Sequence, residues 1–338
     1  MHNNKILVIL GPTASGKTKL AIALANKFNG EIVSADSRQV YRGMDVGTGK
    51  DLSDYKILQK NKKNKIQIPY HLIDVASPKV RFNLAKYQKL ALQAIEDILK
   101  RDKLPILVGG SGLYLQAVVD NFQLSESKPD LILRKKLEKL TVNQLFAKIK
   151  KMSLKMAIKI NNSDKKNKRR LIRYVEILLF DKNFKSKTTK EKKKNPSIPL
   201  CQEGKYETLI IGLTCSKQEL KKRIYDRIIS RLEKEKMIEE VEKLHKQGLS
   251  WRKLESFGLE YKFISLYLQD KKVGDNPRYS ALSRGQEYED MVEKLNIASN
   301  QFANRQLSWF RRWERQGKKI NWTKDNKKIE KLVNQFLK

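Results

Sequence analysis

Eight residues near the start of the sequence have the spacing of a loop that surrounds phosphate groups. They are Gly11-Pro12-Thr13-Ala14-Ser15-Gly16-Lys17-Thr18, here called the phosphate loop. In such loops, backbone N–H groups and the N-terminus of the next helix surround an anion, the lysine adds a positive charge, and the last hydroxyl can ligate Mg²⁺. An apolar run precedes the loop and a helical pattern follows it, as the motif requires. The sequence therefore predicts a phosphate-binding site with Thr18 as a metal ligand.

One acidic residue follows a predicted strand beside this loop. The strand Glu31–Ala35 ends at Asp36, whereas the strand Leu104–Val108 ends in Gly109-Gly110-Ser111-Gly112 and lacks the aspartate that an NTPase places there. Because the carboxyl ends of parallel strands line the ligand crevice, we expect Asp36 to face the phosphates. A carboxylate in that position can hold a metal ion through water, act as a general base, or only cap the next turn.

The elements that position these residues alternate between strand and helix over the first 120 residues. This alternation predicts an α/β fold, a parallel sheet flanked by helices. From 121 to 205 helical patterns replace the strands, and a strand pattern returns at Thr208–Leu213. We therefore predict a core made of residues 1–120 and 206–338, with an inserted all-helical domain at 121–205.

Further elements are expected along the chain. Predicted helices of the core are Lys86–Leu99, Glu219–Gln247, Ser283–Arg315 and one after the strand Lys319–Trp322; those of the insertion are Leu131–Leu140, Val142–Lys151 and Arg169–Leu179. The stretch Phe184–Leu200, with many lysines and two prolines, predicts a mobile loop.

Composition excludes several classes of protein. The 338 residues include 72 Lys and Arg against 37 Asp and Glu, a net charge of +35, and no run of about 18 apolar residues that would cross a membrane. The two cysteines and three histidines form neither a disulfide framework nor a zinc-binding pattern. The first strand begins at Lys5, which leaves no room for a signal peptide. We expect a cytoplasmic protein without a membrane partner.

The positive charge has two interpretations. Lysine-rich composition follows from codon usage in an AT-rich genome, but here the charge is clustered at Lys165–Arg173, Lys182–Lys194 and Arg305–Arg315. The last cluster is interleaved with Trp309, Phe310 and Trp313, which either stack on unpaired bases or pack their helix on the core. Clustering favours a nucleic-acid partner, and the aromatic residues favour RNA.

Seven segments, taken together and in order, resemble the tRNA dimethylallyltransferases, also called tRNA isopentenyltransferases. They are Gly11–Thr18, 34–50 (SADSRQVYRGMDVGTGK), 69–75 (PYHLIDV), 109–120 (GGSGLYLQAVVD), 164–178 (DKKNKRRLIRYVEIL), Arg227–Arg231 ahead of Ile238–Val241, and Asn304–Phe310. The resemblance implies a P-loop kinase-like core and an enzyme that moves a dimethylallyl group from dimethylallyl diphosphate to N6 of adenosine 37, beside the tRNA anticodon, releasing diphosphate. It also implies Mg²⁺, an insertion that grips the anticodon stem-loop, and the bacterial type, since no C-terminal zinc finger is present. We expect the protein to be a monomer.

The resemblance also assigns roles to individual residues. Asp36 becomes the base that takes the N6 proton, and the phosphate loop binds the diphosphate. Ser111 stands where the family usually has a threonine whose hydroxyl meets the bridging oxygen of the diphosphate, and Arg227 corresponds to an arginine on the diphosphate. Expected tRNA contacts are Asp36, Ser37, Arg38 and Gln39 around the target base, and Asn167, Lys168, Arg169, Arg170 and Leu171 in the insertion.

Two other functions share the phosphate loop. A small-molecule or nucleotide kinase would have the same loop and sheet, but gives no reason for a basic helical insertion. An RNA-binding GTPase-like switch would need a guanine-specificity motif, and Asn61-Lys62-Lys63-Asn64 lacks its aspartate. Individual residues also keep two interpretations: Thr48 and Lys50 either face the donor or shape a loop, and His71 is either structural or catalytic.

Overall fold

The computed structural model describes residues 4–58, 65–124, 130–185, 205–273 and 281–338. The chain divides into two compact units, one of Met1–Asp120 with Gly204–Lys338 and one of Asn121–Glu203. The first is called the core unit and the second the insertion. No helix in the described part of the chain is long and apolar enough to cross a membrane.

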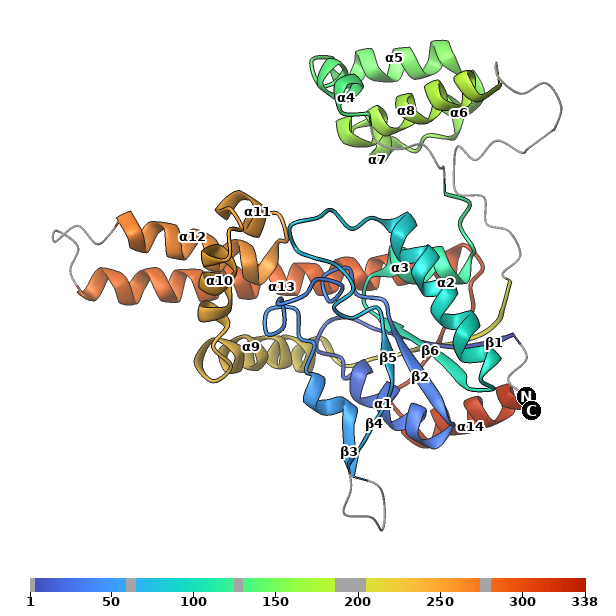
Figure 1. Cartoon of the computed structure of the whole chain (residues 1–338), viewed down its shortest axis with the longest axis vertical. Coiled ribbons are helices and arrows are strands. Elements are labelled where there is room, and N and C mark those ends of the chain that lie inside the picture. The colour runs from blue at the N-terminus through green and yellow to red at the C-terminus, as the bar shows by residue number, and fades with distance from the viewer. Residues whose placement is uncertain (1–3, 59–64, 125–129, 186–204, 274–280) are drawn as a thin grey trace. The chain divides into compact units, whose positions relative to one another are not determined.

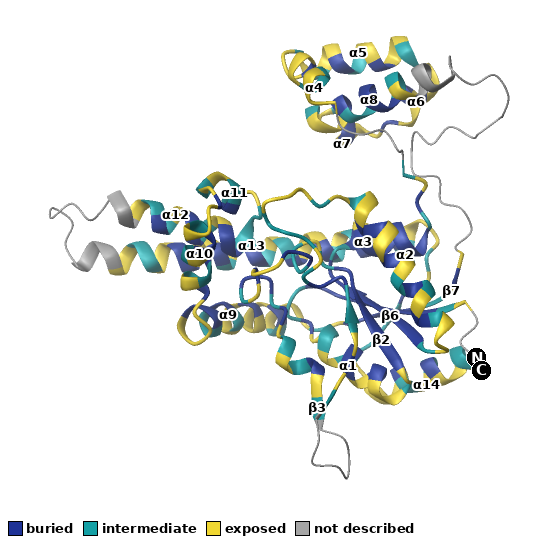
Figure 2. Cartoon of the chain, viewed as in Figure 1, coloured by how far each residue is buried: buried dark blue, intermediate teal, exposed yellow. Residues whose placement is uncertain are grey.

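A six-stranded parallel sheet forms the centre of the core unit (Figure 1). Its order is β5 (Tyr70–His71), β2 (Gly30–Ser34), β6 (Leu104–Gly109), β1 (Lys5–Leu10), β7 (Glu207–Gly212) and β8 (Asn321–Trp322). The central strands are almost continuously apolar because helices cover both faces, and Figure 2 shows them as buried. The predicted α/β fold with a parallel sheet is confirmed.

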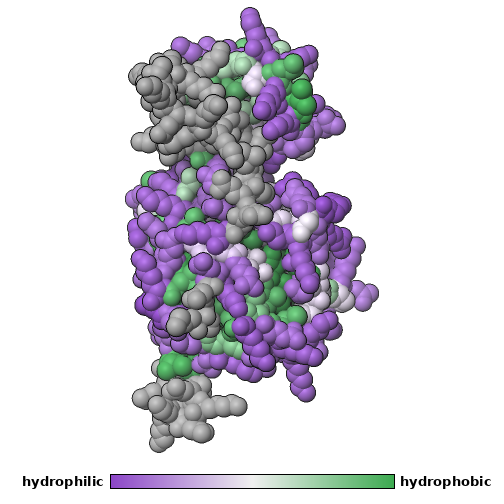
Figure 3. Space-filling model, turned by 90° about the vertical axis from the view of Figure 1, so that its right-hand side faces the viewer, coloured by the Kyte–Doolittle hydropathy of each residue, from purple (hydrophilic) through white to green (hydrophobic). Residues whose placement is uncertain are grey.

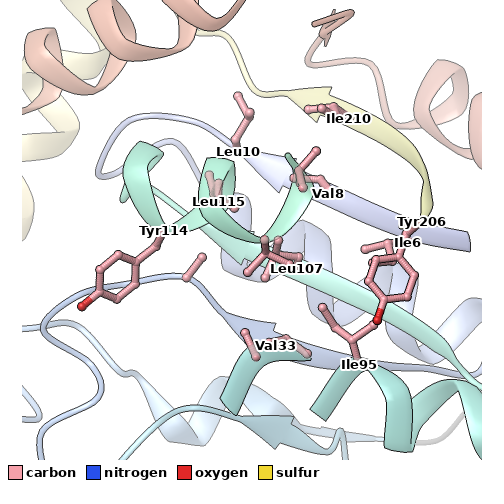
Figure 4. Close-up of a cluster of buried hydrophobic side chains, with 14 of the residues drawn as sticks. Ile6, Val8, Leu10, Val33, Ile95, Leu107, Tyr114, Leu115, Tyr206 and Ile210 are labelled. Atoms are coloured by element: carbon pink, nitrogen blue, oxygen red, sulfur yellow. The ribbon is translucent and has the colours of Figure 1, made fainter. Parts of the chain in front are cut away.

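Alternate strand residues supply two hydrophobic layers. On one face, Val8, Val33 and Leu107 pack with α2 (Leu84–Lys100), α3 (Gly112–Val119) and the end of α13 (Ala281–Arg315), as Figure 4 shows for part of the layer. On the other face, Leu7 and Ile9 pack with α1 (Lys17–Lys27) and α14 (Asn326–Leu337). This period of two is what a strand imposes on its side chains.

A second cluster of helices follows β7. It contains α9 (Lys217–Glu233), α10 (Met237–Lys246), α11 (Trp251–Glu255), α12 (Leu259–Val273) and most of α13. The single predicted helix Glu219–Gln247 is wrong: it is two helices, divided where Lys236 takes a left-handed conformation with φ of 58°. The change of direction lets α10 bury Met237, Val241 and Leu244. A continuous charged helical pattern hides such a break.

The aromatic residues of α13 pack on the core. Phe310 and Trp313 are buried, and the Trp313 indole N–H donates to Asp120 over 2.9 Å. Trp309 is partly buried, with the Arg312 guanidinium 4.3 Å from its ring centre. The packing interpretation therefore holds for Phe310 and Trp313.

A buried carboxylate, that of Glu31, is the contact that decides the role of His71. Glu31 in β2 accepts from Arg101, from Lys103 over 2.8 Å, and pairs with His71 Nε2 at 2.8 Å. The hydrogen bonds from Arg101, which outweigh the effect of burial, lower the pKa of Glu31 to about 2. The contacts of His71 are thus those of a structural residue.

The insertion is helical, as predicted. Its elements are α4 (Leu131–Leu137), α5 (Val142–Met152), α6 (Leu154–Lys159), α7 (Asn162–Lys165) and α8 (Lys168–Lys185), packed around a small apolar core. From residue 186 onward the predicted loop Phe184–Leu200 lies outside the described residues. An antiparallel hairpin of β3 (Lys56–Leu58) and β4 (Lys65–Gln67) in the core unit has no counterpart among the predicted elements.

Candidate functional site

The phosphate loop joins β1 to α1 at the carboxyl edge of the sheet. Ala14 and Gly16 both have positive φ, 60° and 86°. Gly16 is the N-cap of α1, and no side chain there bonds to the free N–H groups of the first helical turn. Those donors therefore remain available to an anion.

A cavity of about 510 Å³ opens beside this loop. It is lined by basic, acidic and apolar side chains from the sheet edge and from α1, α9, α12 and α13. Charged lining residues are Lys17, Lys19, Arg38, Arg223, Arg227, Arg231, Asp36, Asp51, Asp54, Asp226 and Glu260; uncharged ones include Thr13, Thr18, Gln39, Thr48, Tyr55, Val108, Phe302 and Gln306. The structure thus brings the phosphate loop, Asp36 and Arg227 to one cavity.

Two cations in this cavity, Lys17 and Arg227, are half-buried and have no ion-pair partner among the described residues. Lys17 Nζ donates to the Pro12 carbonyl over 3.1 Å, and burial lowers its pKa to about 8 although Asp36 acts in the opposite direction. Burial, with Arg231 nearby, lowers the pKa of Arg227 to about 10. Its Nη2 donates to the Thr13 hydroxyl, and its buried Nε–H has no partner among the described residues. Desolvated, unpaired positive charge of this kind stabilises an anion strongly.

Asp36 follows β2 and is half-buried in the same cavity. One carboxylate oxygen, Oδ1, accepts the N–H of Arg38 over 2.9 Å, so the aspartate is fixed by its own turn. The opposite oxygen has no hydrogen bond within the described chain, which leaves it free to accept a proton.

The residues after Asp36 are held by distant elements. Arg38 pairs with Glu260 of α12 at 2.6 Å; burial alone lowers the pKa of Arg38, but Glu260 and Asp36 raise it overall. The exposed Ser37 donates its N–H to the Ser111 hydroxyl over 3.1 Å. Ser111 therefore lies next to the segment of Asp36, although it is not among the residues that line the cavity.

The five predicted tRNA contacts of the insertion belong to the other compact unit. Asn167 precedes α8 and its side chain accepts the Arg170 N–H over 3.2 Å. Arg169 and Arg170 are exposed, Lys168 is half-exposed, and Arg170 also pairs with Asp164. Leu171 is fully buried in the apolar core of the insertion. Its side chain packs inside the insertion, and contact of this segment with tRNA stays a prediction.

Several cavity residues had no role in the sequence interpretation. Gln306 accepts the Thr13 N–H over 2.8 Å and donates to the Gly110 carbonyl over 3.0 Å, which joins the phosphate loop to the turn before Ser111. Arg231, four residues after Arg227 on α9, is on the same helix face, a spacing that could have revealed it. No such spacing in the sequence pointed to Glu260 or Phe302.

Comparison with known proteins identifies the family. A family model described as IPP transferase matches residues 39–313. A protein from Hahella chejuensis named tRNA dimethylallyltransferase 1 is 41% identical over 323 residues, which cover 95% of this chain and 92% of the relative. The chain belongs to the IPP transferase family.

Other members of the IPP transferase family agree along the whole chain. A tRNA dimethylallyltransferase 1 of Syntrophus aciditrophicus is 41% identical over 318 residues, covering 94% of this chain and 92% of the relative. The solved tRNA isopentenylpyrophosphate transferase of Bacillus halodurans superposes with a TM-score of 0.62 at 32% identity, covering 99% of this chain and 97% of that one. A eukaryotic dimethylallyltransferase acting on tRNA gives a TM-score of 0.67 at 26% identity, covering 91% and 70%. The resemblance to tRNA dimethylallyltransferases is confirmed.

Proposed function

We propose that this enzyme transfers a dimethylallyl group from dimethylallyl diphosphate to N6 of adenosine 37, next to the anticodon of tRNA, and releases diphosphate. Membership of the IPP transferase family supports this reaction. The observation that carries the assignment of the site is the placement of two half-buried, unpaired cations, Lys17 and Arg227, in one cavity with the carboxylate of Asp36.

The chemistry requires two operations: the charge that develops on the leaving diphosphate must be stabilised, and one proton must be removed from N6. The N6 lone pair of adenine is delocalised into the ring, so the allylic carbon must be made a good electrophile. As the N6–C1 bond forms, the C1–O bond breaks and its electron pair stays on the diphosphate. The charge that develops there is stabilised by Lys17, Arg227 and the amides of the phosphate loop. Asp36 takes the proton that N6 loses.

The hydroxyl of Ser111 is proposed to assist the leaving group. It accepts the N–H of Ser37, and its own hydrogen is directed at the Ser37 hydroxyl over a long 3.4 Å. A weak hydrogen bond of this length is easily exchanged for one to an acceptor oxygen of the diphosphate. Ser111 would then donate to the bridging oxygen of the diphosphate.

The residues around the loop fit a magnesium ion. The Thr18 hydroxyl and the carboxylates of Asp36, Asp51 and Asp54 line the cavity, and oxygen is the ligand that Mg²⁺ prefers. No group of three or more His, Cys, Asp or Glu in the described part of the chain could hold a metal by itself. Mg²⁺ bound by Thr18 together with substrate phosphates matches both facts, and the ion would supply positive charge to the leaving group.

tRNA is proposed to contact two regions. Asp36, Arg38 and Gln39 line the cavity, Ser37 lies between them in the sequence, and all four are proposed to contact the target base. In the insertion, Asn167, Lys168, Arg169 and Arg170 are proposed to contact the phosphate backbone of the anticodon stem-loop. The target base must leave its stack to reach the cavity, at a cost of about a few kcal/mol that is smaller in an open loop.

One assay tests the reaction. The protein is incubated with unmodified tRNA, Mg²⁺ and labelled dimethylallyl diphosphate, without ATP, and the label is then mapped in the RNA. We expect label on adenosine 37 only. Absence of label, or phosphoryl transfer once ATP is supplied, would reject the prenyl transfer and favour a kinase.

A further inference from the structure

One wall of the cavity is a loop without regular structure, residues 44–50, here called the wall loop. Thr48 and Gly49 of this loop line the cavity. Because the loop has no strand or helix to support it, its position depends on side chains from elsewhere in the fold.

A single carboxylate on α10 holds the first half of the wall loop. Oε2 of Glu240 accepts the N–H groups of Asp45 and Val46 over 2.8 and 2.7 Å. Its Oε1 accepts the N–H of Gly47 over 3.1 Å and the hydroxyl of Tyr261 over 2.7 Å. All four partners are donors, so both oxygens must act as acceptors, and an amide at this position would turn an NH₂ group toward two of them.

The partners of Glu240 are themselves fixed. Tyr261 is fully buried, and burial together with the Glu240 carboxylate raises its pKa well above the ordinary value, so its hydroxyl stays protonated. A Cβ atom on Gly47 would lie only 2.7 Å from the Tyr261 ring, which leaves no room for a side chain at that position.

A buried lysine holds the other half of the wall loop. Lys50, with 1% of its side chain exposed, donates to the Tyr41 carbonyl over 2.8 Å and to Asp45 and Asp74 over 2.5 Å each. The Thr48 hydroxyl donates to the Met44 carbonyl over 2.5 Å. Lys50 therefore shapes the loop, which decides between its two sequence interpretations.

The wall loop is connected directly to the segment that carries Asp36. The Gly49 carbonyl accepts the side-chain amide of Gln39 over 2.9 Å, and Gln39 in turn accepts the Ser34 hydroxyl over 2.9 Å. Ser34 and Gln39 lie on either side of Asp36 in the sequence. A displaced wall loop would therefore release Gln39 and loosen the turn of the proposed base.

We propose that Glu240 is a positioning residue: its carboxylate fixes the wall loop, and through Gly49 and Gln39 it holds Asp36 in place for proton removal from N6. The proposal rests on the proposed function for its chemical step, while its structural part concerns the loop alone. Glu240 itself does not line the cavity.

The test compares Glu240→Gln with Glu239→Gln, a matched control in the same helical turn whose side chain is exposed. For Glu240→Gln we expect kcat for prenyl transfer to fall by about tenfold or more, because small misplacements of reacting groups are costly. The KM for dimethylallyl diphosphate should change by less than about threefold, since the phosphate loop is untouched. The control should behave as the wild type. An unchanged kcat in folded Glu240→Gln would overturn the proposal.

Hydrogen–deuterium exchange supplies a readout independent of activity. Glu240→Gln should speed exchange at the amides of Asp45, Val46 and Gly47, and the control should not. Unchanged exchange in Glu240→Gln would contradict the claim that Glu240 holds the wall loop, whatever the activity. A wild-type protein that makes no prenylated tRNA would reject the proposed function and leave that structural claim standing.

A double-mutant cycle separates positioning from general weakening of the fold. If Glu240 acts through Gln39, then Glu240→Gln and Gln39→Ala should lower kcat together by far less than the product of their separate effects. Independent effects would contradict the route through Gln39. If Glu240→Gln fails to fold, Tyr261→Phe removes only one of the four hydrogen bonds, and we expect a kcat loss of about two- to fivefold. An unchanged kcat in that variant would count against the proposal.

Discussion

Positive charge is used in opposite ways in the cavity of the core unit and on the surface of the insertion. In the cavity, Lys17 and Arg227 are half-buried and lack carboxylate partners within ion-pair distance among the described residues, and desolvation lowers the pKa of each. In the insertion, the buried carboxylate of Glu176 accepts two hydrogen bonds from Arg134, over 2.6 and 2.8 Å. Lys148, Lys150 and Arg169 of the insertion are exposed, and the face of the molecule in Figure 3 is largely hydrophilic.

The contrast predicts different behaviour toward ligands. A desolvated, unpaired cation interacts strongly over short distances and suits one small anion in one geometry. Exposed cations act through counterion release, which gives salt-dependent affinity for a long polyanion without positioning a reacting atom. Variants in the cavity should therefore alter chemistry, and variants in the insertion should alter binding.

The largest effect is expected from Asp36→Ala. Loss of the proposed base should lower kcat by at least about 10²-fold, since a positioned base contributes about 10²–10⁴-fold. The affinity for tRNA, measured by filter binding, should change little. Retention of a tenth or more of the wild-type kcat would remove Asp36 from this role.

Arg227→Met should give the second-largest loss of kcat. Removing one preorganised donor to a developing charge typically costs about 10²–10³ in kcat. Lys221→Met, at an exposed position on the same helix, is the control and should leave kcat unchanged. Equal losses in both variants would mean that overall charge, and not the placement of Arg227 in the cavity, matters.

The pH dependence of kcat/KM should report the charge of Lys17 in the cavity. The pKa of Lys17 is lowered to about 8, so the free enzyme loses this charge as the pH rises through about 8. The kcat/KM for dimethylallyl diphosphate should then fall by about tenfold between pH 7 and 9, as a single group with that pKa requires. tRNA affinity should stay constant over that range. A flat profile would show that Lys17 keeps its charge.

The insertion should give the smallest effect on catalysis. Changing Lys168, Arg169 and Arg170 together to Ala should weaken tRNA binding several-fold and reduce the salt slope of log Kd by up to about 2, from about 0.7 per lost phosphate contact. The kcat at saturating tRNA should not change. An unchanged salt slope would mean that these residues do not contact the backbone.

The elements that could be predicted from the sequence are those that depend on patterns of consecutive residues. β6, β7 and α13 were expected within a few residues of their observed bounds, because strand and helix periodicities are properties of consecutive residues. The phosphate loop and Asp36 were found for a similar reason, since each follows a strand at a fixed spacing.

What the sequence missed depends on contacts between distant residues. Gln306 reaches the phosphate loop from 293 residues away, and Glu240 reaches the wall loop from 193 to 195 residues away. β5 has only two residues, too few to show a period. The motif around Leu171 identifies a segment, whereas the helical period decides which of its side chains face the core, and the Leu171 side chain is one of these.

The most direct test is a structure of the protein bound to an unreactive thiodiphosphate analogue of dimethylallyl diphosphate. We expect the diphosphate within the phosphate loop, in hydrogen-bonding contact with Lys17 and Arg227, and the allylic carbon between it and the carboxylate of Asp36. An analogue bound outside this cavity, or an Asp36 carboxylate turned away from the allylic carbon, would contradict the account.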